Sequence, residues 1–285
     1  MDVNYKKSII AYYDATRLDY RVLWLSDKNR SVHFGYYDKG IKDHGEALLN
    51  MNRVMATKAE IKDRDIVLDA GCGQGGSAVW LAEQYDVQVT GITLVPHQVE
   101  KAERLARESG VNDRVSFYEK DYTDTGFADE SFTVIWACES LCHALHKKDF
   151  YDEAYRLLKP GGRLICAEYF RSERPLTDAG EALLSEWLDG WSINDIDTME
   201  EHIQNAEASG FIKPRVEDIT TFTEPSLRHL HSMSSKLWAL GRVLKKIGLR
   251  NHVNHGNHYS SIKQYEALKE ELWRYGLLSM TKDDR

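Results

Sequence analysis

Two kinds of segment are missing from this chain of 285 residues. No stretch approaches the ~18 consecutive apolar residues that a membrane-spanning helix requires, so no integral membrane association is expected. Residues 1–7 also lack the apolar run of a secretory signal peptide, which makes the cytoplasm the expected location. The hydrophobic fraction of 42% is that of a globular protein with a sizeable core.

An excess of basic residues is lacking as well. Lys and Arg number 37 against 45 Asp and Glu, which gives a formal net charge of -8. Because nucleic-acid binding requires a basic face that neutralises phosphates, this balance argues against a nucleic-acid partner. Only four cysteines occur, and no pair has a zinc-binding arrangement. We therefore expect reduced, mostly buried thiols and no metal site.

Short apolar strands alternate with helical segments from residue 65 onwards, a pattern typical of right-handed crossovers and a parallel sheet. Helical spacing also occurs before this point, over residues 4–30 and 44–60. The expected strands are 65–70, 87–92, 115–118, 132–137 and 163–168, and the expected helices between them are 77–84, 96–109 and 147–158. The pattern predicts a doubly wound α/β fold, with a turn at 159–162 that ends a helix before a strand.

The pattern loosens after residue 170. The expected helices are 181–191, 199–209, 227–249 and 260–275, and one late strand is expected at 213–219. We interpret residues 61–170 as the core, and residues 171–285 as a completion of the sheet plus a helical cap or insertion. Residues 1–60 are interpreted as an N-terminal helical lid.

The strongest local signal is the sequence V-L-D-A-G-C-G-Q-G-G at residues 67–76, between the first strand and its helix. A glycine-rich turn at this position lets a ligand approach the backbone amides of a helix N-terminus. Its spacing differs from the G-x-G-x-x-G of nicotinamide-binding domains. Asp69, two residues before the first glycine, suits an ammonium group and would repel a pyrophosphate.

This segment resembles the first motif of class I methyltransferases, D-x-G-C-G-x-G, and three similar segments follow in that family's order. Gly91–Gln98 resembles the end of the second strand in the sterol, tocopherol and cyclopropane-fatty-acid subgroup. Asp121–Tyr122 matches the position that receives the adenine amino group, and Leu158–Arg163 matches the turn before the fifth strand. Where most of the family has an acidic residue that holds the ribose, this chain has Thr93, so Gln98 is expected to share that contact.

The resemblance implies a Rossmann-like, seven-stranded, mostly parallel sheet and S-adenosyl-L-methionine as the cofactor. The expected cofactor-binding residues are Asp69, Gly71, Cys72, Gly73, Thr93, Leu94, Gln98, Asp121, Tyr122, Ala137 and Tyr36.

The segment W-A-C-E-S-L-C-H-A at residues 136–144 follows the fourth strand and resembles the E-A-T-C-H-A stretch of sterol C-methyltransferases. Ligands in open α/β sheets bind beyond the carboxyl ends of the strands, so Glu139 and His143 are placed to meet a methyl acceptor. The tyrosine-rich N-terminal segment, ending in His33–Tyr37, resembles the lid that covers the cofactor in sterol and tocopherol methyltransferases. Its Tyr13 is the third catalytic candidate.

Two chemistries suit these residues. Methylation of an alkene carbon creates a carbocation, which aromatic faces stabilise and a base such as Glu139 or His143 quenches by removing a proton. Methylation of a phenol or an amine needs a base for the acceptor, which the same two residues can supply. The aromatic candidates are Tyr12, Tyr13, Tyr20, Tyr36, Tyr37 and Trp136.

We therefore expect a methyltransferase for a hydrophobic small molecule, with C-methylation of an isoprenoid (a prenyl diphosphate or a sterol-like acceptor) as the leading hypothesis. O- or N-methylation of a phenolic or alkaloid-like natural product is the alternative. Cyclopropanation of a lipid chain is disfavoured, because the bicarbonate-binding residues of that family cannot be placed in this sequence. A protein that binds S-adenosyl-L-methionine without catalysis is the alternative of another class.

Two signals in the C-terminal part carry weaker hypotheses. Residues 228–250 are basic, and we interpret them as a solvated helix face. A site for an anionic substrate group, or a membrane surface that would make a peripheral contact, are the functional alternatives. His252, His255 and His258 lie among asparagine and glycine and are interpreted as a solvated loop. A homodimer stays open.

Overall fold

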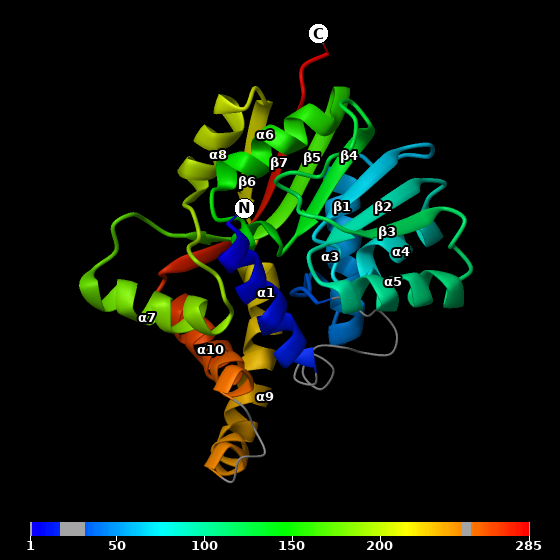
Figure 1. Ribbon diagram of the computed structural model, residues 1–285. Coiled ribbons are helices and arrows are strands. Elements are labelled where there is room, and N and C mark those ends of the chain that lie inside the picture. The colour runs from blue at the N-terminus through cyan, green and yellow to red at the C-terminus, as the bar shows by residue number, and fades with distance from the viewer. Residues whose placement is uncertain (1, 18–31, 247–251, 285) are drawn as a thin grey trace.

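A seven-stranded sheet forms the centre of the computed structural model, which describes residues 2–17, 32–246 and 252–284 (Figure 1). The strand order is β3-β2-β1-β4-β5-β7-β6. The first five strands are parallel, and β7 runs antiparallel to both of its neighbours. The strands are β1 (Ile66–Ala70), β2 (Gln88–Thr93), β3 (Val115–Glu119), β4 (Phe132–Cys138), β5 (Leu158–Arg171), β6 (Ile212–Asp218) and β7 (Trp273–Thr281).

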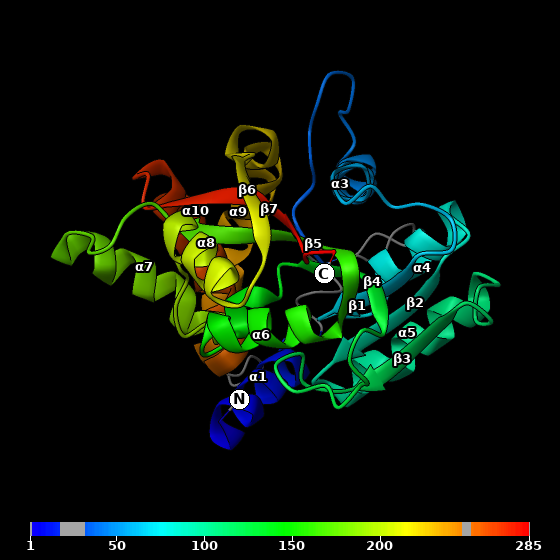
Figure 2. The same cartoon turned by 90° about the horizontal axis from the view of Figure 1, so that it is seen from above.

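Helices cover both faces of this sheet. Helices α3, α4 and α5 pack on one face, and α6 and α8 pack on the other, so that α3 and α6 lie on opposite sides when the sheet is viewed from above (Figure 2). The described helices are α1 (Val3–Ala15), α3 (His44–Lys58), α4 (Gly76–Gln84), α5 (Pro96–Glu108), the short 3-10 helix η1 (Leu141–His143), α6 (Lys147–Leu157), α7 (Asp178–Gly190), α8 (Met199–Ala208), α9 (Thr220–Lys246) and α10 (His252–Lys269).

Successive residues of the inner strands enter two separate hydrophobic cores. Val67 of β1 and Val134 of β4 face the α3–α4–α5 layer, whereas their neighbours Leu68 and Ile135 face the α6–α8 layer. This alternation follows from the two-residue repeat of a β-strand, and strands buried on both faces read as near-continuous apolar runs. The apolar runs of the sequence therefore became the inner strands.

The strand order reverses direction between β1 and β4, which leaves a crevice beyond the carboxyl ends of the strands. Helices α1, α7, α9 and α10 gather at this end of the sheet (Figure 1). Helix α10 packs against both α7 and α9. Segments from both ends of the chain therefore enclose the region where the sequence predicts a cofactor.

The final helix expected at 260–275 is wrong in its second half. Helix α10 ends at Lys269, Glu271 takes a left-handed conformation with φ 57, and β7 begins at Trp273. Leu268, Leu272 and Tyr275 keep helical spacing, which hides the strand in a pattern of single residues. Pairing with β5 and β6 favours a strand over a helix here, because it satisfies the backbone hydrogen-bonding groups along both edges of β7.

The loop expected around His252, His255 and His258 is also wrong, because all three residues lie in α10. Asparagine and glycine are weak helix formers, but tertiary packing overrides them here. Asn257 and His258 are buried, and Asn257 accepts a hydrogen bond from the hydroxyl of Tyr12 at 2.7 Å.

Three other boundaries differ from expectation. The turn expected at 159–162 lies inside β5 and coincides with a register shift against β4. Helix α9 begins at Thr220, seven residues before the expected start. Residues 18–30 of the N-terminal helical pattern, with Tyr20, and residues 247–249 of the basic segment lie outside the described residues.

A buried ion pair joins the amino ends of β1 and β5. Arg163 donates to both carboxylate oxygens of Asp65 at 2.7 Å, and Asp65 is only 2% exposed. We predict that Arg163→Ala lowers the free energy of unfolding by about 3 kcal/mol, because it leaves a buried carboxylate without its partner. Urea denaturation measures this loss.

The control is Arg104→Ala on α5, whose pair with Glu108 is exposed and 3.8 Å long. This variant is expected to change stability by less than about 0.5 kcal/mol. Equal losses in the two variants would contradict a structural role for the buried pair.

Candidate active site

The glycine-rich turn after β1 brings three strand ends together. The backbone amides of Gly71 and Cys72 both donate to the carbonyl of Ile92 at the end of β2, at 2.9 Å. Gly71 has a φ of +93, and a Cβ there would lie 2.3 Å from the Cβ of Ser140, just beyond β4. Only glycine allows this approach, which explains the residue type at this point of the motif.

A pocket of about 800 Å³, measured out to its open mouth, lies over this turn. Six of the residues predicted to bind the cofactor line it: Gly71, Gly73, Thr93, Leu94, Gln98 and Tyr122. A smaller cavity of about 350 Å³ adjoins it, since both contain Gly71, Gly73 and Gln74. This second space is lined by two more predicted residues, Asp69 and Cys72.

Asp69 is the most informative member of this group. Its side chain is buried, and no donor among the described residues reaches its Oδ2 atom. Burial raises the pKa of Asp69 to about 7, which a hydrogen bond from the backbone of Ala78 only partly opposes. A buried carboxylate oxygen without a donor is costly, so this position fits a cationic ligand group.

The two positions expected to hold the ribose are bonded to each other. The hydroxyl of Thr93 donates to Oε1 of Gln98 at 2.7 Å, and both side chains are buried at the wall of the pocket. This contact fixes the Gln98 side chain, so that its amide group can donate to a ligand hydroxyl.

Asp121, expected at the adenine, already has partners within the chain. One oxygen accepts hydrogen bonds from the backbone and hydroxyl of Thr123, and the other pairs with Lys6 of α1 at 2.7 Å. Burial alone would raise the pKa of Asp121, but these donors hold it below its usual value. Helix α1 is therefore tied directly to the adenine side of the predicted site.

Three predicted cofactor residues, Asp121, Ala137 and Tyr36, do not line these cavities. Ala137 is buried within β4, and Tyr36 stacks on Phe222 of α9 with ring centroids 4.6 Å apart. The backbone amide of Tyr36 donates to the carbonyl of Ala47, so this part of the N-terminal segment is anchored on α3.

A third cavity, of about 360 Å³ when it is also measured out to its open mouth, adjoins the large pocket on the side of β4. Tyr13, Val32, Glu139 and His143 line both spaces, so all three catalytic candidates stand at the boundary. The remaining wall is aromatic or apolar apart from hydroxyl and thiol groups: Tyr12, Cys142, Tyr169, Trp191 and Ile193. Among the residues that the structure describes, neither a lysine nor an arginine lines it.

His143 and Tyr13 form a pair across the boundary. The hydroxyl of Tyr13 lies 3.0 Å from Nε2 of His143. Burial lowers the pKa of His143 to about 4, although a backbone hydrogen bond with Ser192 opposes the shift. The imidazole is therefore neutral at pH 7 and able to accept a proton.

Glu139 has three donors within the chain. Its Oε1 accepts hydrogen bonds from the amide of Phe34 at 2.5 Å and from the hydroxyl of Tyr275 at 2.7 Å, and its Oε2 accepts one from the hydroxyl of Tyr169. Burial raises the pKa of Glu139 to about 8, against the opposing effect of these donors. The carboxylate joins the N-terminal segment to β4, β5 and β7.

The basic segment 228–250 does not reach these cavities with any described residue. Arg228 pairs instead with Glu224 on the surface of α9. Over residues 2–17, 32–246 and 252–284, no group of three His, Cys, Asp or Glu side chains could hold a metal ion.

Comparison with known proteins agrees with this geometry. The Methyltransferase domain family matches residues 68–166. A probable tocopherol O-methyltransferase of Oryza sativa subsp. japonica is 32% identical over 231 residues, 76% of this chain and 61% of that protein. A 27-O-demethylrifamycin SV methyltransferase of Amycolatopsis mediterranei is 31% identical over 196 residues, 69% of this chain and 72% of that protein.

The chain belongs to the class I S-adenosylmethionine-dependent methyltransferases. The crystal structure of the [4+2]-cyclase SpnF has the same fold, with a TM-score of 0.81, 24% identity and coverage of 98% of this chain and 97% of that one. The methyltransferase chain spans about three fifths of the length of its tocopherol relative. The predicted fold class is confirmed by the sheet and by these comparisons.

Two buried charges of this methyltransferase were not singled out from the sequence, and together they hold the turn η1 that carries His143. Glu168 of β5 accepts the amide of Cys142 at 2.9 Å. The ammonium of Lys147 donates to the carbonyls of Cys142 and Ala144, at 3.2 and 2.7 Å, and to that of Asp195. The two charged groups therefore bind the amide and the carbonyl of Cys142. Glu168 ended a predicted strand, but nothing in the sequence pairs it with Lys147.

Burial raises the pKa of Glu168 to about 7 and lowers that of Lys147. Burying the charges of Glu168 and Lys147 costs desolvation free energy. Its benefit here is a fixed direction for the His143 ring, since small misplacements of a reacting group lower rates severely.

We predict that Glu168→Gln shifts or broadens the ring resonances of His143, because the turn loses one charged hydrogen-bond partner. Nitrogen-15 spectra of labelled protein, assigned with His143→Gln, measure this without any substrate. The control is Glu153→Gln, a buried carboxylate that bonds Thr125 and Arg156 instead. Unchanged His143 resonances in the Glu168 variant would contradict the positioning role.

Proposed function

We propose that this chain binds S-adenosyl-L-methionine and transfers its methyl group to a carbon atom of a hydrophobic isoprenoid acceptor. The observation that carries this proposal is the aromatic cavity beside the large pocket, with Tyr13, Glu139 and His143 at the boundary. None of the described residues in its wall is a lysine or an arginine, which favours an uncharged, sterol-like or prenylated acceptor over a prenyl diphosphate.

The large pocket and the cavity around Asp69 are the proposed cofactor site. Asp69 would hold the ammonium group, the turn of Gly71, Cys72 and Gly73 the amino-acid end, and Thr93, Leu94 and Gln98 the ribose. Asp121 and Tyr122 would lie at the adenine. When bound, the cofactor supplies an activated methyl group, so the protein contributes mainly positioning.

The division of the chain follows the same proposal. Residues 1–60 would supply the lid through α1, which carries both Lys6, the partner of Asp121, and Tyr13; α3 in the same stretch packs on the sheet. Residues 61–170 would be the cofactor-binding core. Residues 171–285 complete the sheet with β6 and β7 and contribute Trp191 and Ile193 to the acceptor cavity.

Proton removal is assigned to His143. Methylation of an alkene carbon leaves a carbocation, and loss of a proton from a neighbouring carbon would restore the double bond. The proton would pass to the Tyr13 oxygen as the tyrosine proton moves to Nε2 of His143. An imidazole whose pKa is about 4 is basic enough for a carbocation, but too weak to deprotonate a phenol of pKa about 10 in advance. Tyr12, Tyr13 and Trp191 would present aromatic faces to the cation.

Glu139 has a different proposed role. Its three internal donors leave it poorly placed to abstract a proton. It would instead keep the Phe34 segment closed over the site through the hydrogen bond from the Phe34 amide.

O-Methylation of a hydroxyl acceptor is the second candidate. The Tyr13–His143 pair favours it, since a hydroxyl at the position of the tyrosine oxygen would donate to Nε2. The names of the tocopherol and rifamycin relatives agree with it. The weak basicity of His143 would then require proton and methyl transfer in one step.

The first experiment is calorimetric titration with S-adenosylhomocysteine. Asp69→Asn is expected to weaken binding at least about tenfold, the usual scale for one lost charged hydrogen bond. Because the carboxylate is the binding form, affinity of the wild type should rise with pH through about 7 and then level off. The variant should lack this rise.

The matched control is Asp113→Asn, an exposed residue of the loop before β3, which should keep the wild-type affinity. No binding by the wild type at any pH would remove the cofactor assignment. Binding without methyl transfer to any acceptor would favour the non-catalytic alternative.

The second experiment screens sterols, prenylated quinols and simple phenols with S-adenosyl-L-methionine labelled in the methyl group. Mass spectrometry is expected to place the label on carbon. His143→Ala should lower kcat by about 10² to 10⁴, the range for loss of a general base. Label on oxygen alone would support the second candidate instead.

Further expectations from the sequence stay predictions. Sedimentation velocity tests the homodimer, and cell fractionation tests the cytoplasmic location. Among the helices of the described residues, none is long and apolar enough to cross a membrane.

A further inference from the structure

One stretch of this acidic chain is entirely free of acidic residues. Between Glu224 and Glu266 there is no Asp or Glu, while seven Lys and Arg residues occur: Arg228, Lys236, Arg242, Lys245, Lys246, Arg250 and Lys263. The rest of the chain holds all 45 carboxylates. The proposed methyl transfer uses none of these basic residues.

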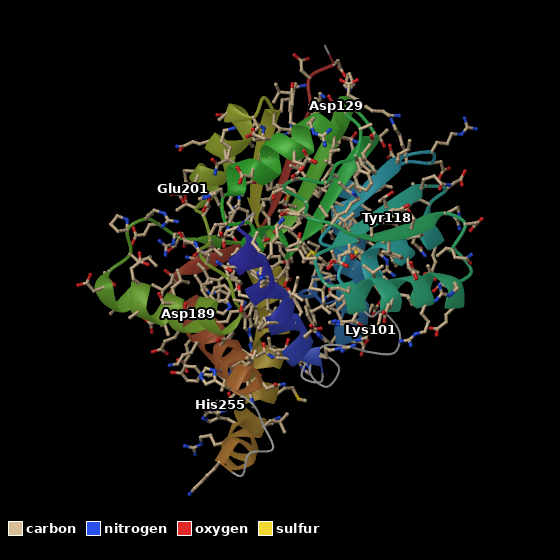
Figure 3. The ribbon with its side chains drawn as sticks, in the orientation of Figure 1. Lys101, Tyr118, Asp129, Asp189, Glu201 and His255 are labelled. Carbon is tan, nitrogen blue, oxygen red and sulfur yellow. The ribbon has the colours of Figure 1, made fainter. Side chains whose placement is uncertain are left out.

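This stretch belongs to the α9–α10 hairpin, defined here as residues 220–246 and 252–269. The C-terminal turns of α9 project below every other described element (Figure 1). Carboxylates such as Asp129, Asp189 and Glu201 lie on the body of the molecule, whereas His255 lies on the hairpin (Figure 3). Charge of one sign is thus gathered on a protruding part.

Three cations of the hairpin face solvent without a carboxylate partner among the described residues: Lys236, Arg242 and Lys246. Arg242 and Lys246 are four residues apart, so they lie on one face of α9. By contrast, Arg228 and Lys263 nearer the body pair with Glu224 and with Glu186 and Glu266. The free charge therefore increases toward the projecting end.

Aromatic packing holds this part of the hairpin together. The Trp238 ring stacks on His255 at 4.6 Å between centroids and lies 5.5 Å from that of Tyr259. Val253, at the start of α10, is 38% exposed. The hairpin thus presents exposed cations and one exposed aliphatic side chain, while Trp238 packs its two helices together, a combination compatible with a membrane interface.

We propose that the projecting end of the α9–α10 hairpin docks on an anionic lipid surface. The occupant is a bilayer and not nucleic acid, because a long polyanion would also meet the acidic body of the protein. The charge on the hairpin complements anionic headgroups, and the apolar side chains add contact at the boundary of the acyl chains.

The first turns of α10 contact two residues of the acceptor cavity. Asn257 of α10 accepts from the hydroxyl of Tyr12 and, through its carbonyl, from the indole of Trp191 at 3.3 Å. Both aromatic residues line the proposed acceptor cavity. Docking would give the site access to a lipophilic acceptor in the bilayer, and this purpose rests on the proposed function. The docking itself does not depend on that function.

Vesicle co-sedimentation of the full chain, without cofactor or acceptor, tests the docking. The probes are vesicles of phosphatidylcholine alone and with about one third phosphatidylglycerol; the variant is Arg242→Gln with Lys246→Gln. The wild type is expected to bind only the anionic vesicles and to be released by high salt. The variant should bind about 25-fold more weakly, since each cation contributes about fivefold.

The matched control is Arg104→Gln with Arg107→Gln, which removes the same charge from an exposed face of α5. It should bind anionic vesicles like the wild type. Equal weakening in both variants would show a non-specific charge effect and overturn the proposal. So would wild-type binding to a DNA duplex but to neither vesicle. The experiment measures vesicle binding and not turnover. Its outcome therefore tests the docking even if the chain proves to transfer no methyl group.

Discussion

The organisation of the site depends on one buried carboxylate. Glu139 receives hydrogen bonds from Phe34, Tyr169 and Tyr275, which come from the N-terminal segment, β5 and β7. Glu139 itself has a φ of 50, a left-handed conformation that is uncommon for a residue other than glycine. Three donors from distant parts of the chain outweigh that strain, and they fix the boundary between the two cavities.

A second constraint lies beneath the same turn. Glu168 accepts from the amide of Cys142 and Lys147 donates to its carbonyl, so the backbone just before His143 is held on both sides. Asp69 shows the opposite arrangement, a buried carboxylate with one oxygen that no described donor reaches. The first two groups are buried at a cost in desolvation and hold the turn, whereas Asp69 keeps an oxygen free for the ammonium group of the proposed cofactor.

Helix α1 couples the two halves of the site. Lys6 pairs with Asp121 at the adenine side, and Tyr13 meets His143 at the acceptor side. A single helix thus contacts both ends of the proposed reaction, and its position affects cofactor and acceptor together. The same helix is anchored on α10 through Tyr12 and Asn257, so the C-terminal hairpin is part of this arrangement.

The sequence alone determined the parallel core, because strands buried on both faces and glycines at forced turns leave local signals. It also determined the positions of Asp69, Gly71, Gln98 and Glu139, since the ends of parallel strands meet at one edge. It could not reveal β7, whose apolar residues also suit a helix, nor the helical state of His252–His258 in α10. It also could not pair Glu168 with Lys147 or gather the donors of Glu139. These features depend on contacts between residues far apart in the chain, which only the tertiary structure decides.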